Sequence, residues 1–190
     1  MTTALYHLAL PQAVFANPAA SILLPIALGT AVGYSTRPQV NDLDVRSLKQ
    51  PPLRPPPYVF GPVWTVLYGL MGYAAYRAVG VPGPTELSRD TRIISASIYT
   101  AQLGLNLIWM PLFFSLRRPI EATIDSVALL GLNVYLASLW LEQPATEVAG
   151  WCMVPYVAWL SFATYLSAGT GYLNGWSLRR DKGKGPAKDQ

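Results

Sequence analysis

The sequence predicts an all-α membrane protein, a bundle of five transmembrane helices, and three observations support this. Hydrophobic residues make up 52% of the 190 residues and charged residues only 13%, against about 25% charged residues in an average soluble domain. The charges are clustered, which leaves five long uncharged stretches. These stretches show no alternation of apolar and polar residues, and in lipid only helices and closed barrels satisfy the backbone hydrogen bonds.

The uncharged stretches set the expected helices. Apart from His7, they comprise residues 1 to 36, 55 to 76, 93 to 116, 126 to 141 and 148 to 178. A transmembrane helix needs roughly 20 apolar residues, and only the fourth stretch is shorter than that. We therefore expect a single domain of residues 1–180, with spans at about 18–36, 58–79, 91–115, 119–141 and 146–175, and a disordered basic tail at 181–190.

The first helix is expected to begin at Pro18, because Asn17 is a preferred N-cap residue and proline is favoured at the first helical position. Gly29 and Gly33 form a small-residue step that lets a neighbouring backbone come close. Further steps of this kind lie at Ser97/Ala101 and Gly171/Gly175. Such steps join helices within a subunit or between subunits, so a homodimer remains an alternative.

Residues 51–57, PPLRPPP, precede the second helix. Proline fixes φ and restricts the residue before it, so this segment is expected to be a stiff, extended strut. It is either a plain connection or a lid over the end of the bundle. The lid residues would be Arg54, Pro55, Pro56 and Tyr58.

The fourth helix reaches spanning length only if it begins near Pro119, which puts Asp125 about two turns inside it. A charge in the middle of a membrane is costly. The carboxylate therefore either reaches back to Arg117 or Arg118 at the membrane surface, or serves a ligand or a proton.

The charge distribution predicts the topology. With five spans, 11 of the 14 basic residues fall on one side of the membrane, in the loop 37–57, the turn at 117–118 and the tail. By the positive-inside rule, the proline loop and the C-terminus face the cytosol. The N-terminus has no Lys or Arg before Arg37, so neither a secretory signal nor a matrix transit peptide is expected.

Several classes of function are excluded. Cys152 is the only cysteine and His7 the only histidine, which rules out a disulfide framework, a Cys/His zinc site and a Cys–His nucleophile pair. No basic run is interleaved with aromatic residues, so nucleic acid is not an expected partner. We expect no metal and no cofactor.

Three helices each turn aromatic or amide side chains to one face at helical spacing. These are Trp64, Tyr68 and Met71 on the second helix, Gln102, Asn106 and Trp109 on the third, and Tyr156, Trp159 and Ala163 on the fifth. Amides in lipid need partners, so Gln102 and Asn106 should point into the bundle, either to join helices or to bind a ligand. Pro111 and Pro155 should kink their helices and open a cleft. Trp140, Trp151 and Trp176, near the ends of spans, are expected to be interfacial anchors.

Three segments of the chain resemble one family. KQPPLRPPPYVFGPVWTVLYGLMGYAAY, QLGLNLIWMPLFF and VPYVAWLSFATYL look like signatures of the TspO/translocator protein family, also called the peripheral benzodiazepine receptor family. The resemblance extends from about Leu28 to Trp176. It implies a five-helix membrane protein, often dimeric, with a cavity under the loop between the first two helices. Family members bind porphyrins and benzodiazepine-type ligands, and animal members also bind sterols.

The resemblance also implies a set of pocket residues. They are Trp64, Trp109 and Trp159, with Asn106, Pro155, Tyr156, Phe162 and Ala163 nearby; the spacing argument adds Tyr68 and Gln102. In some bacterial members, tryptophans matching Trp64 and Trp159 are linked to light-dependent breakdown of bound protoporphyrin. Leu53 and Tyr58 depart from the family pattern, which commonly has tryptophan at both positions.

The expected function is binding and translocation of a flat hydrophobic ligand, most simply protoporphyrin IX, with its carboxylates near Arg54. The alternatives are an enzyme that oxidatively degrades the porphyrin through Trp64 and Trp159, and a sterol- or lipid-binding transport or scaffold protein. The resemblance implies the mitochondrial outer membrane for a eukaryotic source and a bacterial membrane otherwise.

Overall fold

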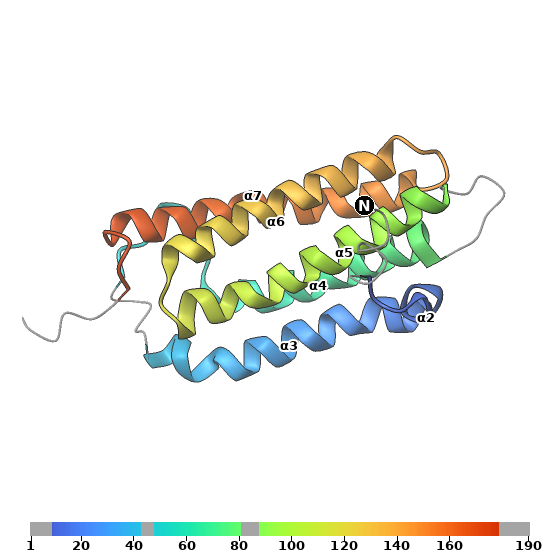
Figure 1. Cartoon of the computed structure of the whole chain (residues 1–190). Helices are drawn as coiled ribbons and strands as arrows, with labels where there is room; N and C mark the ends of the chain where they lie inside the picture. The colour runs from blue at the N-terminus through green and yellow to red at the C-terminus, as the bar shows by residue number, and fades with distance from the viewer. Residues whose placement is uncertain (1–8, 43–47, 81–87, 179–190) are drawn as a thin grey trace, which may run out of the picture.

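The computed structural model describes residues 9–42, 48–80 and 88–178, and these residues form six α-helices and two short π-helical segments. The elements in order are α2 (Gln12–Ala16), α3 (Pro18–Asp42), α4 (Pro57–Ala75), η1 (Tyr76–Gly80), α5 (Arg89–Met110), η2 (Pro111–Ser115), α6 (Pro119–Leu141) and α7 (Glu147–Leu173). No strand occurs within these ranges. The five long helices run side by side, with α6 and α7 on one side of the bundle and α3 on the other (Figure 1).

Three of these helices are long and apolar enough to cross a membrane, over Pro18–Asn41, Arg89–Ser115 and Pro119–Leu141. The all-helical class predicted from the sequence is therefore confirmed. α4 and α7 are also long, with 19 and 27 residues, but they are not among these three helices.

The sixth helix, α2, was not predicted, because one uncharged stretch was expected to hold one helix. Asn17 separates α2 from α3. As predicted, it is the N-cap of α3: its Oδ1 accepts hydrogen bonds from the backbone N–H of Ala19 at 2.9 Å and of Ala20 at 3.2 Å. His7 and the predicted tail at 181–190 lie outside the described residues.

Polar contacts fix the register of α5 against α6, which run antiparallel. Ser95 pairs with Trp140, and Gln102 pairs with Asn133. The residue numbers add up to 235 in both pairs, as they must when two antiparallel helices keep one register. The register of α6 against α7 is fixed in the same way, because Ser126 pairs with Thr164 at 3.4 Å. These registers decide which side chains meet across the bundle.

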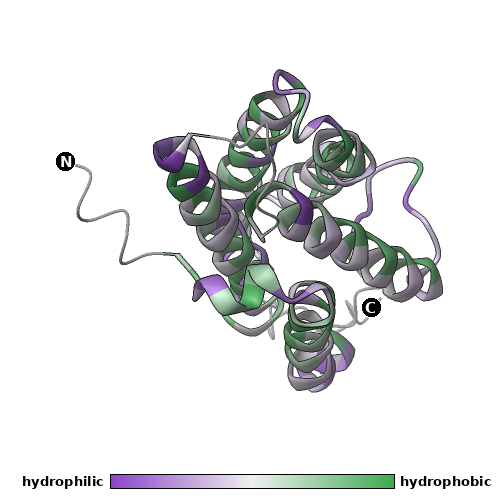
Figure 2. Cartoon of the chain, turned by 90° about the vertical axis from the view of Figure 1, so that its right-hand side faces the viewer, coloured by the Kyte–Doolittle hydropathy of each residue, from purple (hydrophilic) through white to green (hydrophobic). Residues whose placement is uncertain are grey.

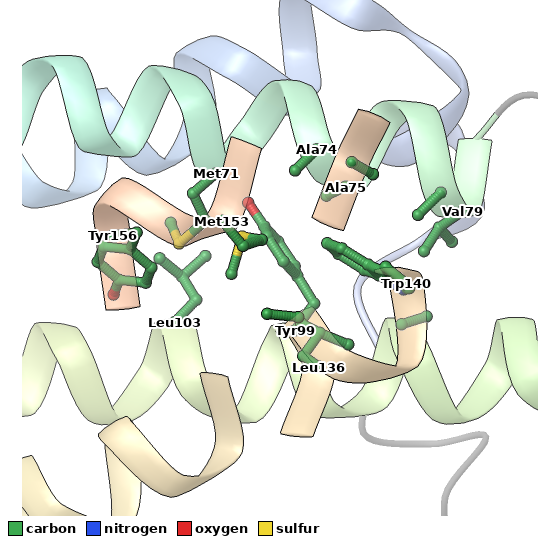
Figure 3. Packing of buried hydrophobic residues seen from close by; sticks show 14 of the residues in the cluster. Met71, Ala74, Ala75, Val79, Tyr99, Leu103, Leu136, Trp140, Met153 and Tyr156 are labelled. Carbon is green, nitrogen blue, oxygen red and sulfur yellow. The ribbon is translucent and has the colours of Figure 1, made fainter. Parts of the chain in front are cut away.

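The main core lies between α4, η1, α5, α6 and α7 (Figure 3), and Phe15 of α2 belongs to it. Trp140, Tyr99 and Tyr156 are the largest side chains in it and are 0%, 2% and 0% exposed. The Trp140 indole N–H donates to Ser95 Oγ at 3.1 Å. The predicted interfacial position of Trp140 is therefore wrong, since α5 supplies a partner for its N–H inside the core, whereas Trp151 and Trp176 are exposed.

α3 and α4 approach closely through small residues. Ser21 Oγ donates to the Gly72 carbonyl at 2.8 Å. A Cβ added at Gly72 would lie 2.7 Å from Ile22 Cα and also strike the Ser21 carbonyl, and one added at Gly29 would strike the Tyr68 ring. Gly29 therefore faces α4 of the same subunit, whereas a Cβ added at Gly33 would meet nothing within 4 Å.

We expect Gly72→Val to destabilise the bundle, because the backbone of α3 would have to move away. Overpacking of this kind costs about 1 to 3 kcal/mol. The matched control is Gly131→Ala on α6, where an added Cβ meets nothing within 4 Å; this change should be neutral or stabilising by up to about 1 kcal/mol. Thermal unfolding of the two variants in detergent measures the difference, and equal melting temperatures would contradict the close approach.

α5 changes to the π-helical segment η2 at Pro111, as expected for a proline that removes a backbone donor. The Pro111 carbonyl accepts from the Leu116 N–H at 2.9 Å, five residues on. Pro155 lies inside α7, which continues through it.

Candidate functional site

A chain of hydrogen bonds joins α4, α5 and α7 through four of the predicted site residues. The Tyr68 hydroxyl donates to Asn106 Oδ1. Asn106 Nδ2 donates to the Tyr156 hydroxyl at 2.8 Å, and that hydroxyl donates to Gln102 Oε1 at 3.3 Å. The two amides thus link side chains from three helices.

The series of hydrogen bonds continues to α6 through Asn133, a residue that was not predicted from the sequence. Asn133 Nδ2 donates to Gln102 Oε1 at 3.3 Å, and Gln102 Nε2 donates to Met71 Sδ at 3.0 Å. Gln102 and Asn133 are fully buried. Asn133 lies in an uncharged stretch of a long helix, so the rule that placed Gln102 and Asn106 inside the bundle would also have found Asn133.

The direction of these bonds determines what the site offers a ligand. The Tyr68 proton is committed to Asn106, and the Tyr156 proton to Gln102. Each phenol oxygen can therefore only accept a further hydrogen bond. At the outer end of the chain, the half-buried Tyr68 offers an acceptor to a ligand that carries an N–H or O–H group.

Two of the three predicted pocket tryptophans lie beside these hydrogen-bonded side chains. The Trp64 ring is 5.5 Å from the Tyr68 ring and 6.2 Å from the Tyr156 ring. Trp159 lies one turn after Tyr156 on α7 and packs against Phe60 at 5.9 Å and Phe162 at 5.7 Å. Both indoles pack against the main core and are half-buried.

Trp109 belongs to a second cluster with Phe113, Phe114 and Ala122. Its ring stacks on Phe113 at 5.1 Å. The indole N–H groups of Trp109 and Trp159 are buried and have no hydrogen-bond partner among the described residues. Ala163 lies one turn after Trp159 on α7 and is half-buried.

The proline loop is attached to the C-terminal half of α7. Asn174 bonds both backbone groups of Lys49: its Oδ1 accepts from the N–H at 3.1 Å and its Nδ2 donates to the carbonyl at 2.9 Å. The Tyr165 hydroxyl donates to the Pro52 carbonyl at 3.2 Å. Gly169 makes room for Pro51, because a Cβ added there would lie 2.8 Å from Pro51 Cβ.

The four predicted lid residues differ in exposure. Arg54 and Pro55 are half-buried, Pro56 is exposed, and Tyr58 is 78% exposed. Burial lowers the pKa of Arg54 below its ordinary value, but a guanidinium stays charged at neutral pH. Within the described ranges Arg54 has no acidic partner, so it could receive an anionic group.

Asp125 is buried, and its Oδ2 has no hydrogen-bond partner in the described part of the chain. Arg118, one of the two arginines predicted to meet Asp125, pairs instead with Glu121 at 3.1 Å, one turn before Asp125. No group of three or more His, Cys, Asp or Glu side chains that could hold a metal occurs in the described segments.

Comparison with known proteins gives consistent matches. A sequence profile described as the TspO/MBR family matches residues 21–173. A translocator protein homolog of Schizosaccharomyces pombe is 40% identical over 152 residues, which are 80% of this chain and 88% of that protein. A tryptophan-rich protein TspO of Archaeoglobus fulgidus is 33% identical over 155 residues (82% and 95%). A translocator protein of Homo sapiens is 35% identical over 123 residues (63% and 68%).

Proposed function

Because this chain belongs to the TspO/MBR family, a family of translocator-type membrane proteins, we propose that it binds a flat hydrophobic ligand, most simply a tetrapyrrole such as protoporphyrin IX. The ligand lies among α4, α5 and α7, in a cavity capped by the proline loop. Of the residues predicted from the sequence, the half-buried Trp64, Tyr68, Trp159, Phe162 and Ala163 contact the ligand. The buried Gln102, Asn106 and Tyr156 hold Tyr68 in position, and Trp109 lies in the neighbouring cluster with Phe113.

The observation that carries this proposal is the hydrogen-bonded chain from Tyr68 to Gln102 beside the half-buried rings of Trp64 and Trp159. Aromatic faces favour a flat π-system. The acceptor oxygen of Tyr68 suits the pyrrole N–H of a free-base porphyrin, and the charged Arg54 on the loop suits a propionate.

We also propose that all five long helices cross the membrane and that the proline-loop end faces the cytosol. Five of the described cations are near that end: Arg37, Lys49, Arg54, Arg117 and Arg118. α4 and α7 join the three spans named above because α4 packs against α3 and α7, and α7 packs against α6, within the same bundle (Figure 1). For a eukaryotic source the membrane is the mitochondrial outer membrane. A homodimer is compatible with these contacts.

Titration with protoporphyrin IX in detergent, in the dark, tests the proposal. We expect saturable quenching of tryptophan fluorescence. Trp64→Phe and Trp159→Phe should each raise Kd by about three- to tenfold, since an aromatic contact is worth about 0.5 to 1.5 kcal/mol. Trp151→Phe is the matched control, because Trp151 is 61% exposed on α7.

Unchanged Kd in both pocket variants would refute the proposed site, and absence of saturable binding would favour the lipid-binding or scaffold alternative. An illuminated arm separates binding from the enzyme alternative. Bleaching of the porphyrin that is lost in Trp64→Phe or Trp159→Phe would make the protein a porphyrin-degrading enzyme.

A further inference from the structure

The short helix α2 is fastened to the bundle at the end opposite to the proline loop. α2 precedes α3 and the loop follows it, and the 25 residues of α3 span about 37 Å. Figure 2 looks onto the bundle from the α2 end, where α2 crosses beside α3. α2 lies before the residues that the family profile matches, so its role is not given by the family match.

Two side-chain hydrogen bonds hold this segment against neighbouring helices. The Leu10 backbone N–H donates to Thr100 Oγ1 on α5 at 2.9 Å. Gln12 Nε2 donates to the Val79 carbonyl of η1 at 3.2 Å. The segment therefore bridges the end of the α4 and η1 pair and the first half of α5.

Phe15 is the apolar anchor of α2. It is 1% exposed and meets the Tyr99 ring edge-on at 5.6 Å. The α2 backbone also lies directly on Gly80, where an added Cβ would strike the Phe15 carbonyl and approach the Ala16 nitrogen at 3.1 Å. A five-residue helix has little stability of its own, so these contacts hold α2 in place.

The two ends of the bundle differ in packing. Around α2, the side chains of Phe15, Val79, Tyr99 and Trp140 are all at most 2% exposed. Figure 3 shows Tyr99 and Trp140 near the middle of the packed residues and Val79 at their edge. Nearer the proline loop, the indoles of Trp64, Trp109 and Trp159 are only half-buried. The α2 end is thus closed by tightly packed rings.

We propose that residues 9–16 are a latch that keeps this end of the bundle shut, so that ligand is exchanged at the proline-loop end. Release of Phe15 from the core opens the α2 end. Ligand exchange at the proline-loop end rests on the proposed function, whereas closure of the α2 end by residues 9–16 does not.

The native Cys152 reports on opening of this end without any ligand. It is the only cysteine in the chain. It lies in the second turn of α7 and is partly buried against the core cluster that contains Phe15. A water-soluble maleimide should therefore modify it faster when α2 leaves.

The experiment measures the rate of Cys152 modification in the full chain in detergent. Phe15→Ala should raise the rate by about tenfold or more, because opening of a segment held by one buried ring becomes far easier when the ring is removed. Gly80→Val should do the same, because it displaces α2 while Phe15 stays intact. Phe114→Ala is the control, since it removes a half-buried ring near the other end.

Unchanged modification in both Phe15→Ala and Gly80→Val overturns the latch. An equal rise in Phe114→Ala also overturns it, because the effect would then be general loosening. Protoporphyrin IX release, measured in the same variants, should become faster by a similar factor. If no variant and no wild-type sample binds porphyrin, the proposed function fails, but the Cys152 rates still decide whether α2 closes its end.

Discussion

Replacing Asn106 with leucine is expected to destabilise the protein by about 2 to 4 kcal/mol, at about 1 to 2 kcal/mol for each interhelical hydrogen bond lost. Asn106 accepts from the Tyr68 hydroxyl and donates to the Tyr156 hydroxyl. A leucine of similar size would remove the acceptor of the half-buried Tyr68 hydroxyl and one of the two partners of the buried Tyr156 hydroxyl. Buried polar groups that lose a partner bear the full cost of desolvation.

The same change should weaken protoporphyrin IX binding, because Tyr68 and Tyr156 would no longer be held in position. Denaturation of the purified protein and porphyrin titration measure the two effects. The control is a double-mutant cycle: Tyr68→Phe should cost clearly less in the Asn106→Leu background than in the wild type. Additive effects would mean that Asn106 does not act as the link between these helices.

The all-helical class was predictable because a helix that crosses the lipid must have a minimum length and must carry few charged side chains. The fourth helix illustrates this, since the start at Pro119 was required for spanning length and α6 occupies Pro119–Leu141. α2 was not predictable in this way. Its five residues carry no periodic pattern, and it is held by Phe15 against Tyr99, a contact made across 84 positions in the sequence.

The inward direction of the α5 amides was predictable, since Gln102 and Asn106 are 0% and 5% exposed. Their partners were not, because the choice between Tyr68, Tyr156 and Asn133 depends on how the helices are rotated and shifted against one another. Trp109 shares a face with Gln102, but seven residues are about 10 Å along a helix. It therefore reaches the second cluster, with Phe113, and not the cluster of Trp64 and Trp159.

Releasing the proline loop from α7 should have the second large effect. Gly169→Leu places a side chain where Pro51 packs, since a Cβ alone would lie 2.8 Å from Pro51 Cβ. The proline segment is stiff, so it cannot adjust locally and should leave α7 as a unit. Asn174→Ala tests the same attachment independently, because it removes both bonds to Lys49.

Both variants should expose the bond between Lys49 and Gln50 to trypsin, whereas the bond after Arg54 stays resistant because Pro55 follows it. We expect cleavage after Lys49 to become about tenfold faster or more, as for a segment that loses its buried contacts. The matched control is Gly104→Leu on α5, where an added Cβ meets nothing within 4 Å. Protoporphyrin IX dissociation should accelerate in parallel if the loop caps the ligand. Faster cleavage with an unchanged dissociation rate would show that the loop is only a connection, and unchanged cleavage in both variants would contradict its attachment to α7.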